Sequence, residues 1–180
     1  MTETPPSATE APYFPVSRLK LFVMSVTTLS MYQIYWFYKN WQLANARKGS
    51  GGSPFWRALA APITAHGLFA EVRTDAQSRF VTVGWSSAGL AVIYFGLTLC
   101  CFLDYPWWTI ALGSVFALLP VHTTMETVNA KVAPNAPRND GFSATDAVVI
   151  VVGIALTVLG LYLTRRAQIF LDQLMNELDV

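Results

Sequence analysis

Long apolar runs, separated by short clusters of charged residues, dominate the pattern of this chain. Four of the runs, 19–38, 84–103, 107–121 and 147–163, are candidates to cross a bilayer as helices. At about 1.5 Å per residue the first run rises about 30 Å, one hydrocarbon thickness. The third reaches only about 22 Å, so we expect it to tilt or to continue beyond its last residue. The pattern predicts an all-α helical membrane protein with about four transmembrane segments.

The first run closes on a dense aromatic cluster, LSMYQIYWFYKNW over 29–41, in which Lys39 marks the water side. Tyrosine and tryptophan gather at the membrane–water interface because each combines an apolar ring with a polar N–H or O–H group. Gln33 needs a partner helix or water inside the run, and hydrogen bonding between helices is favoured over a transport path. The candidate functional positions of this cluster are Tyr32, Gln33, Tyr35, Trp36 and Lys39.

The segment 54–72 begins with a clear helix start, in which Ser53 is the N-cap and Pro54 the first helical residue. The segment is apolar, but it is short for a span and contains Pro62 as well as charged residues. We therefore expect a helix that lies in the membrane interface, or a re-entrant helix kinked at Pro62.

The helix of the third run is expected to leave the membrane and to continue along its surface, because an apolar stripe follows at helical spacing. Beside this stripe, His122 and Glu126 lie one turn apart and could hold a metal ion or relay a proton. No other histidine or cysteine is near, so a solvated or interfacial polar face is favoured, and both residues stay candidate functional positions. The stripe is formed by Val121, Met125, Val128 and Val132.

The two ends of the chain are expected to lie outside a membrane domain that covers 17–166. Residues 1–16 are rich in proline, serine and threonine, which predicts a disordered tail. Residues 167–180 alternate apolar and acidic faces at helical spacing, which predicts an amphipathic helix for the membrane surface or a partner. In the last span, Gly153 and Gly160 share one face and would let another helix approach closely.

Composition supports a membrane protein and narrows its chemistry. Only 13% of the residues are charged, whereas soluble domains carry about 25%. The net charge of +1 offers no basic stripe for nucleic acid. Motifs of serine hydrolases, phosphate loops, zinc proteases and redox cysteine pairs are missing, so we expect no enzyme, cofactor or metal. Cys100 and Cys101 are adjacent in an apolar run, where buried thiols are favoured over reversible acylation.

Positive charges leave the orientation open between two arrangements. Four full spans would place eight Lys and Arg residues on the side of the 39–83 connector and four on the side of both termini. If the first run dips into the membrane and returns, the count becomes ten against two, which fits the positive-inside rule better. Serine and threonine in the middle of the run leave room for a dip, although irregular backbone is excluded where it faces lipid.

The aromatic cluster resembles the motif of an uncharacterised family of small bacterial multi-pass integral membrane proteins, roughly T-L-G-x-Y-x-x-Y-W-F-Y-K-N-W. Segments at 53–58, 119–121, 128–129 and 133–134 are similar to that family too, so the resemblance covers nearly all the chain after the tail. This chain has Ser30 where the pattern has glycine, which weakens the interpretation of a tight re-entrant break. The resemblance implies a multi-pass protein of the bacterial inner membrane and brings no reaction with it.

Two functions stay open on these grounds. The first is a structural, accessory or scaffold protein, whose partners are the lipid bilayer and a membrane protein or a second copy of itself. The alternative is a small transporter or lipid-handling protein, in which the aromatic cluster and Gln33 form a lining. In that case His122 and Glu126 would lie at a gate.

Overall fold

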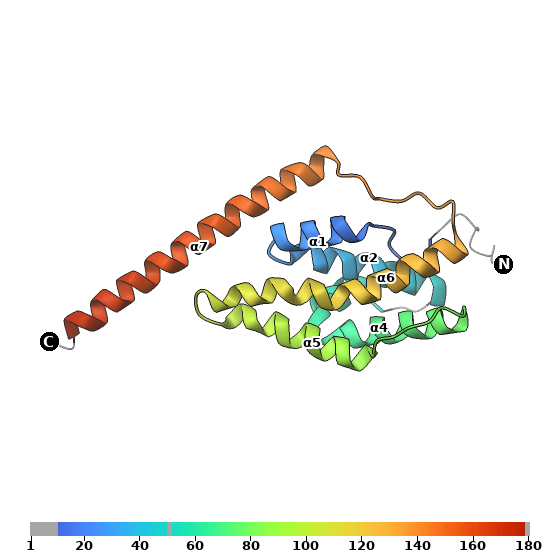
Figure 1. Ribbon diagram of the computed structural model, residues 1–180, viewed down its shortest axis with the longest axis horizontal. Helices are drawn as coiled ribbons and strands as arrows, with labels where there is room; N and C mark the ends of the chain where they lie inside the picture. Colours follow the sequence, from blue (N-terminus) through green and yellow to red (C-terminus); the bar gives the residue numbers. More distant parts are fainter. Residues whose placement is uncertain (1–10, 50–51, 179–180) are drawn as a thin grey trace.

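A computed structural model describes residues 11–49 and 52–178, and over these residues the chain is all helical. Figure 1 shows α1 and α2 as one antiparallel hairpin, α5 and α6 as another, and α7 leaving the bundle diagonally. The elements are α1 (Arg18–Thr27), α2 (Met31–Lys48), α3 (Pro54–Leu59), α4 (Ala61–Ser78), α5 (Ser87–Leu99), η1 (Cys100–Phe102), η2 (Trp107–Ser114), α6 (Val115–Val132) and α7 (Ala144–Leu178).

The first apolar run does not form the single helix predicted over 19–38, because the chain turns back between α1 and α2. Leu29 and Ser30 have φ angles of 51° and 68°, in the left-handed region. The Ser30 amide donates to the Ser25 carbonyl, a bond that closes the last turn of α1. The expectation of a continuous span here is wrong, since these local bonds end one helix and reverse the chain without a glycine.

The Thr28 side chain caps both helices of this turn. Its hydroxyl donates to the Met24 carbonyl at 2.6 Å and accepts the Tyr32 amide at 3.0 Å. The orphan backbone groups at the end of α1 and the start of α2 are therefore satisfied by one threonine.

The N-terminal part of the chain is ordered earlier than predicted. Of the expected tail, residues 1–10 lie outside the described residues, but Tyr13 and Val16 are buried at 0% and 1% exposure. Val16 bridges to Asn139, whose amide donates to the Pro15 carbonyl at 2.7 Å. A disordered tail is thus wrong for 11–16, because apolar side chains in this short segment find a binding surface on the bundle.

The predicted helix over 54–72 is two helices, which meet at Ala60 rather than at Pro62. Pro62 lies in the first turn of α4, where proline is tolerated. The buried face of α4 packs into the core, while its placement in the membrane interface stays a prediction. That face consists of Ala61, Ala65, Leu68, Phe69, Val72 and Ala76.

The second hairpin, formed by α5 and α6, extends beyond the turn of the first hairpin (Figure 1). α5 continues into η1 and turns at 103–106 before η2 and α6 return. Val121, Met125 and Val128 are completely buried, so the helix continues along its apolar stripe to Val132 as predicted.

The last helix is one continuous element of 35 residues, so the separate amphipathic helix expected at 167–180 is an extension of the apolar segment. Its backbone approaches α1 closely at Gly153, where an added Cβ would lie 2.0 Å from the Thr27 carbonyl oxygen. The expected close approach is confirmed at Gly153. It is not confirmed at Gly160, where an added Cβ would have no atom of another element within 4 Å.

Two helical stretches of the described residues are long and apolar enough to cross a membrane. They are Trp107–Val132, which joins η2 to α6, and Ala144–Glu177. The apolar stretch Ser87–Phe102 is shorter. The four transmembrane segments predicted from the sequence are therefore not confirmed as four.

Candidate functional site

The aromatic residues predicted as functional positions divide between two faces of α2. Tyr32 and Trp36 are buried, whereas Tyr35 is exposed. The Tyr35 ring packs edge-on against Phe14, with ring centroids 5.7 Å apart, and the Lys39 ammonium lies 5.8 Å from its centroid. The cluster is consequently not one site, because only its buried face reaches the interior.

Gln33 is buried at 1% exposure and pairs with one side chain of η2. Its amide nitrogen donates to the Ser114 hydroxyl at 3.0 Å, and that hydroxyl lies 3.2 Å from the Gln33 amide oxygen. The pair joins the first hairpin to the second, as expected for a hydrogen bond between helices.

His122 faces the interior from α6 and contacts the N-terminal segment. Its Nε2 lies 2.8 Å from the Val16 carbonyl oxygen, and because a carbonyl only accepts, this nitrogen carries the proton. The ring also meets Trp36 with centroids 6.1 Å apart. Nδ1 of His122 is buried and has no partner. The structure thus brings together two of the predicted positions, one from each hairpin.

Glu126 binds arginines rather than a metal-ligand set. Arg18 lies 3.0 Å away and Arg138 3.7 Å away, while His122 is at the outer limit of contact at 3.9 Å. Among the described residues, no group of three or more His, Cys, Asp or Glu side chains is close enough to hold a metal ion. Glu126 therefore joins α6 to the start of α1 and to the loop before α7.

The N-terminal segment 11–17 is held between helices by two asparagines. Asn129 forms a reciprocal pair with Tyr13, accepting its amide at 2.9 Å and donating to its carbonyl at 3.0 Å. Asn40 is fully buried and accepts the Phe14 amide at 3.1 Å. These hydrogen bonds satisfy backbone groups of the extended segment, which has no neighbouring strand to pair with.

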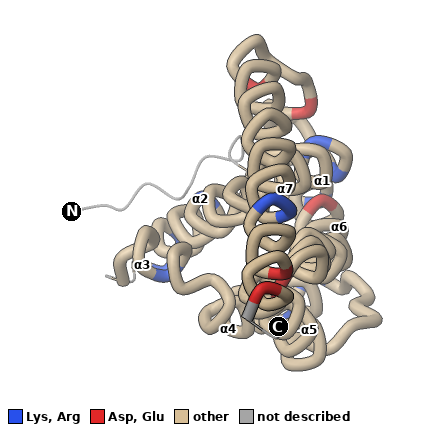
Figure 2. The backbone as a smooth tube through the Cα atoms, turned by 90° about the vertical axis from the view of Figure 1, so that its left-hand side faces the viewer, with Lys and Arg blue, Asp and Glu red and all other residues tan. Residues whose placement is uncertain are grey.

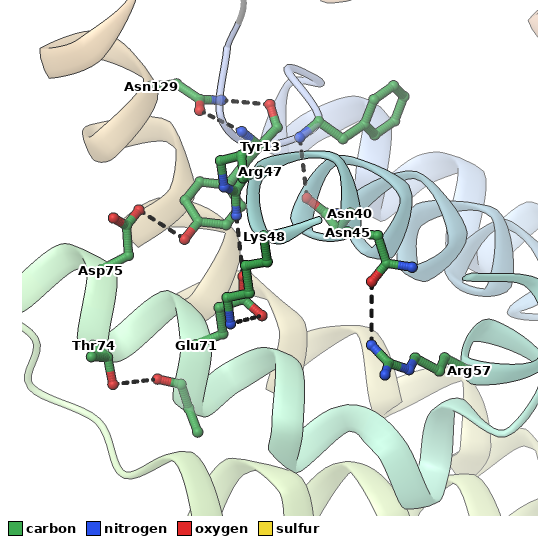
Figure 3. A network of polar contacts seen from close by, with 12 residues as sticks. Tyr13, Asn40, Asn45, Arg47, Lys48, Arg57, Glu71, Thr74, Asp75 and Asn129 are labelled. Carbon is green, nitrogen blue, oxygen red and sulfur yellow. Dashed lines mark hydrogen bonds and ion pairs between the residues drawn. The ribbon is translucent and has the colours of Figure 1, made fainter. Parts of the chain in front are cut away.

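A cleft of about 730 Å³ opens between α2 and α4, beside this segment. Figure 3 shows its charged side chains converging from α2, α3 and α4, with Tyr13 behind them against Arg47 and Asp75. The lining residues that α2 contributes are Trp41, Ala44, Asn45, Arg47 and Lys48, and Arg57 comes from α3. Those of α4 are Gly67, Ala70, Glu71, Thr74, Asp75 and Ser78.

The acidic side chains of this cleft are each matched by donors. Glu71 lies 3.3 Å from the Arg47 guanidinium and 3.1 Å from the Lys48 ammonium. Asp75 accepts the Tyr13 hydroxyl at 2.9 Å and pairs with Arg79, one turn along α4, at 2.9 Å.

The Tyr13 phenol stays a neutral donor in this network. Burial, and next the negative charge of Asp75, raise its pKa well above the ordinary value of a tyrosine. The Arg47 guanidinium stacks over the Tyr13 ring at 4.7 Å and opposes that rise. The N-terminal segment therefore supplies a hydroxyl donor to Asp75, one of the residues that line the cleft.

Arg57 is the cation of the cleft whose side chain stacks on an indole. Its guanidinium lies 4.7 Å from the Trp41 ring centroid and donates to the Asn45 side-chain oxygen at 3.3 Å. Such stacking favours arginine over lysine, since the planar guanidinium keeps its N–H groups free at the edge of the ring.

A buried lysine escaped the sequence analysis. Lys20 is 2% exposed, and its ammonium donates to Asn139 at 2.9 Å, to the Gly141 carbonyl at 2.9 Å and to Asp146 at 2.7 Å. All three donors are thereby used, and α1 is tied to the start of α7. Asp146 also forms a capping box with Ser143, which precedes α7.

Apart from Trp41, which belongs to the aromatic cluster, the cleft residues were not predicted, because they form no motif at a recognisable spacing in the sequence. The one available signal was the density of cations in 39–57, which entered only the topology argument. Comparisons of the chain with models of protein families, with characterised proteins and with solved structures find no match.

Proposed function

We propose that this chain is an integral protein of the bacterial inner membrane that acts as a structural or accessory scaffold. Three arms would cross the membrane: α5 with η1, η2 with α6, and α7. The α1–α2 hairpin would enter the membrane and return to the same side.

The observation that carries this proposal is the pair of polar contacts at the two ends of the apolar part of α7. At one end Asp146 binds Lys20, and at the other Gln168 donates to the Tyr105 carbonyl at 3.3 Å. Gln168 lies 22 positions beyond Asp146, a rise of about 33 Å, which is close to the hydrocarbon thickness of about 30 Å. Both contacts therefore suit the two surfaces of one membrane.

Side chains between these two levels support a lipid surround. The segment 147–164 of α7 contains no charged residue, and neither does 80–103, which includes α5 and η1. Many of the apolar side chains there are exposed on the protein itself. Examples are Val92, Ile93, Phe95, Val151, Leu156 and Leu159.

The depth of the α1–α2 hairpin follows from its contact with α7. Thr27 meets Gly153, which lies seven residues beyond Asp146, or about 10 Å along the helix. The turn would then end about a third of the way across the membrane. Its irregular backbone at Leu29 and Ser30 is compatible with this depth, because α7 covers the neighbouring Thr27.

The charge distribution orients this arrangement. One side would contain ten Lys and Arg residues, and the other, beyond the apolar part of α7, would contain Arg165 and Arg166. The positive-inside rule places the larger group in the cytoplasm. The ten are Arg18, Lys20, Lys39, Arg47, Lys48, Arg57, Arg73, Arg79, Lys131 and Arg138.

Labelling of single cysteines in intact cells, with Cys100 and Cys101 replaced, tests this topology. An impermeant maleimide is expected to label cysteines placed at Asp104 and Asn176 but not those at Arg18, Ser53 and Asn139. Label at position 18 from outside would overturn the re-entrant hairpin and favour four spans. Equal labelling of every position only after lysis would overturn the proposed crossing of α5, α6 and α7.

The scaffold role rests on the extension of α7 past its apolar part. Ile169, Phe170, Leu171 and Met175 are exposed there, and the segment has no helix packed beside it among the described residues. Deletion of 167–180 is expected to release a bound partner while the bundle keeps its unfolding midpoint. If affinity purification recovers the same proteins with and without this segment, the partner role of the extension fails.

A transporter is supported less well by these contacts. Gln33 is already paired with Ser114, and the protonated nitrogen of His122 is taken by the Val16 carbonyl. Flux into liposomes that falls with Gln33→Leu or Glu126→Ala would reverse this ranking.

A further inference from the structure

The cleft between α2 and α4 has the chemistry of a phosphate site next to a membrane. Its cations are Arg47, Lys48 and Arg57, and its acids are Glu71 and Asp75. Because Glu71 is shared by Arg47 and Lys48, its negative charge is already met by two positive charges. Asp75 is matched by donors of its own, so a positive excess is left at the Arg57 end.

Arg57 carries this excess. Among the described residues no carboxylate lies within ion-pair distance of its guanidinium, whose contacts are the Asn45 side-chain oxygen and the Trp41 ring. A guanidinium has five N–H donors, and these contacts use few of them. The remaining donors suit the paired oxygens of a phosphate.

A second observation at the same place concerns Trp41. This residue lines the cleft and is 6% exposed, and its indole N–H is buried with no acceptor. An indole nitrogen can only donate, so the missing partner has to be an acceptor. Buried donors without partners are uncommon in folded proteins, and an acceptor that enters beside Arg57 would complete this one.

The surroundings of Arg57 indicate where the acceptor comes from. α3 lies at the outer edge of the bundle in the end-on view of Figure 2, and its neighbouring side chains Phe55 and Trp56 are 56% and 65% exposed. Leu59 and Ile63 are exposed as well. Large aromatic and aliphatic side chains beside a cation are typical of a surface that enters the headgroup layer of a membrane.

We propose that this cleft binds the phosphodiester headgroup of an anionic phospholipid, with Arg57 on the phosphate. The Trp41 N–H donates to a second oxygen, and the acyl chains lie on the exposed apolar side chains of α3. A singly charged phosphodiester matches the single positive charge that Arg57 leaves unpaired, whereas a doubly charged phosphate monoester would exceed it.

Native mass spectrometry of the purified full chain in detergent tests the site. Phosphatidylglycerol, phosphatidylcholine and soluble glycerol phosphate are titrated separately. Phosphatidylglycerol is expected to bind tightest, and Arg57→Gln to weaken it about tenfold, as for loss of a charge-assisted hydrogen bond. Arg73→Gln, which removes the same charge from α4 outside the cleft, is the matched control and is expected to change binding less than twofold.

Two more variants separate chemistry from folding. Trp41→Phe keeps the ring under Arg57 but removes the N–H, and a three- to tenfold loss is expected. Arg57→Lys keeps the charge and is expected to restore part of the affinity that Arg57→Gln loses. Circular dichroism of each variant shows whether the helices remain.

The other outcomes overturn the proposal. Equal losses for Arg57→Gln and Arg73→Gln would mean that only overall charge matters. Equal binding of phosphatidylcholine would remove the selectivity for an anionic headgroup, and equal binding of glycerol phosphate would identify a site for soluble phosphate esters. The inference rests on the proposed membrane location, which the labelling pattern tests by itself, so the two can fail separately.

Discussion

The two helical hairpins of this protein differ in what covers them. The α1–α2 hairpin buries polar side chains along its length, among them Lys20, Gln33 and Asn40, and each of these has a partner. The α5 arm of the second hairpin has no charged residue, and of its side chains only Ala91 and Tyr94 are buried. The first hairpin is thus stabilised by specific hydrogen bonds, whereas the exposed apolar side chains of α5 fit the proposed contact with lipid.

In the proposed membrane placement, this difference accounts for the shorter first hairpin. A helix in lipid satisfies its own backbone, but a turn does not, so a turn at intermediate depth must be covered by protein. Thr28 caps the turn internally, and α7 crosses it at Gly153. The turn of the second hairpin lies at Asp104, where the proposed far surface supplies water instead.

The largest expected effect comes from Lys20→Met, which leaves Asp146 without its cation. Lys20 is buried and Asp146 is partly exposed, so loss of their charge-assisted hydrogen bond should cost about 2–3 kcal/mol. The free energy of unfolding in SDS titrations followed by circular dichroism measures this cost. Arg18→Met on the same helix is the control. Its side chain is 62% exposed, so its loss should cost less than about 1 kcal/mol. Equal losses of unfolding free energy for the two variants would mean that the buried Lys20 is no more important for stability than the exposed Arg18.

Gly153→Leu is expected to destabilise the protein by about 1–3 kcal/mol, because the added side chain has to displace α7 from the Thr27 carbonyl. Gly96→Leu on α5 is the matched substitution in the other hairpin. No atom lies within 4 Å of its added Cβ, so we expect a change of less than about 0.5 kcal/mol. The same unfolding titrations measure both. A tolerated Gly153→Leu would mean that α7 does not need to lie against the first hairpin.

The hydrogen bond between Gln33 and Ser114 is expected to contribute a smaller free energy, which a double-mutant cycle measures as the interaction energy of the two side chains. In a double-mutant cycle of Gln33→Leu and Ser114→Ala, the interaction should be about 0.6–1.7 kcal/mol, the range for hydrogen bonds between membrane helices. Thr98→Ala on α5 replaces Ser114→Ala in the control cycle. Its hydroxyl bonds to the Tyr94 carbonyl within α5, so its coupling to Gln33 should be zero within error. Coupling of equal size in both cycles would contradict a specific pair.

Sequence patterns predicted the helical class, the continuation of α6 to Val132 and the close approach at Gly153. These features depend on short-range periodicity and local bonds. The break between α1 and α2 was left open between a full span and a dip, because the run looks continuous in hydropathy and Ser30 stands where a tight turn favours glycine. The Lys20 cluster and the cleft were missed for another reason. Lys20 and Asp146 are 126 positions apart, and Trp41 and Gly67 meet only through tertiary packing.

The smallest expected effect concerns Ser30, and it tests the turn of the first hairpin directly. Ser25 and Ser30 both have a buried hydroxyl without a partner, so replacement by glycine removes the same group at each position. Their backbones differ, since Ser25 is helical and Ser30 has a φ of 68°. Ser30→Gly should raise the free energy of unfolding by about 1 kcal/mol through relief of left-handed strain. Ser25→Gly should lower it by about 0.5–1 kcal/mol, as glycine does inside a helix. Opposite signs for two otherwise equal substitutions would place the reversal of the chain at Ser30, and equal signs would restore a continuous first span.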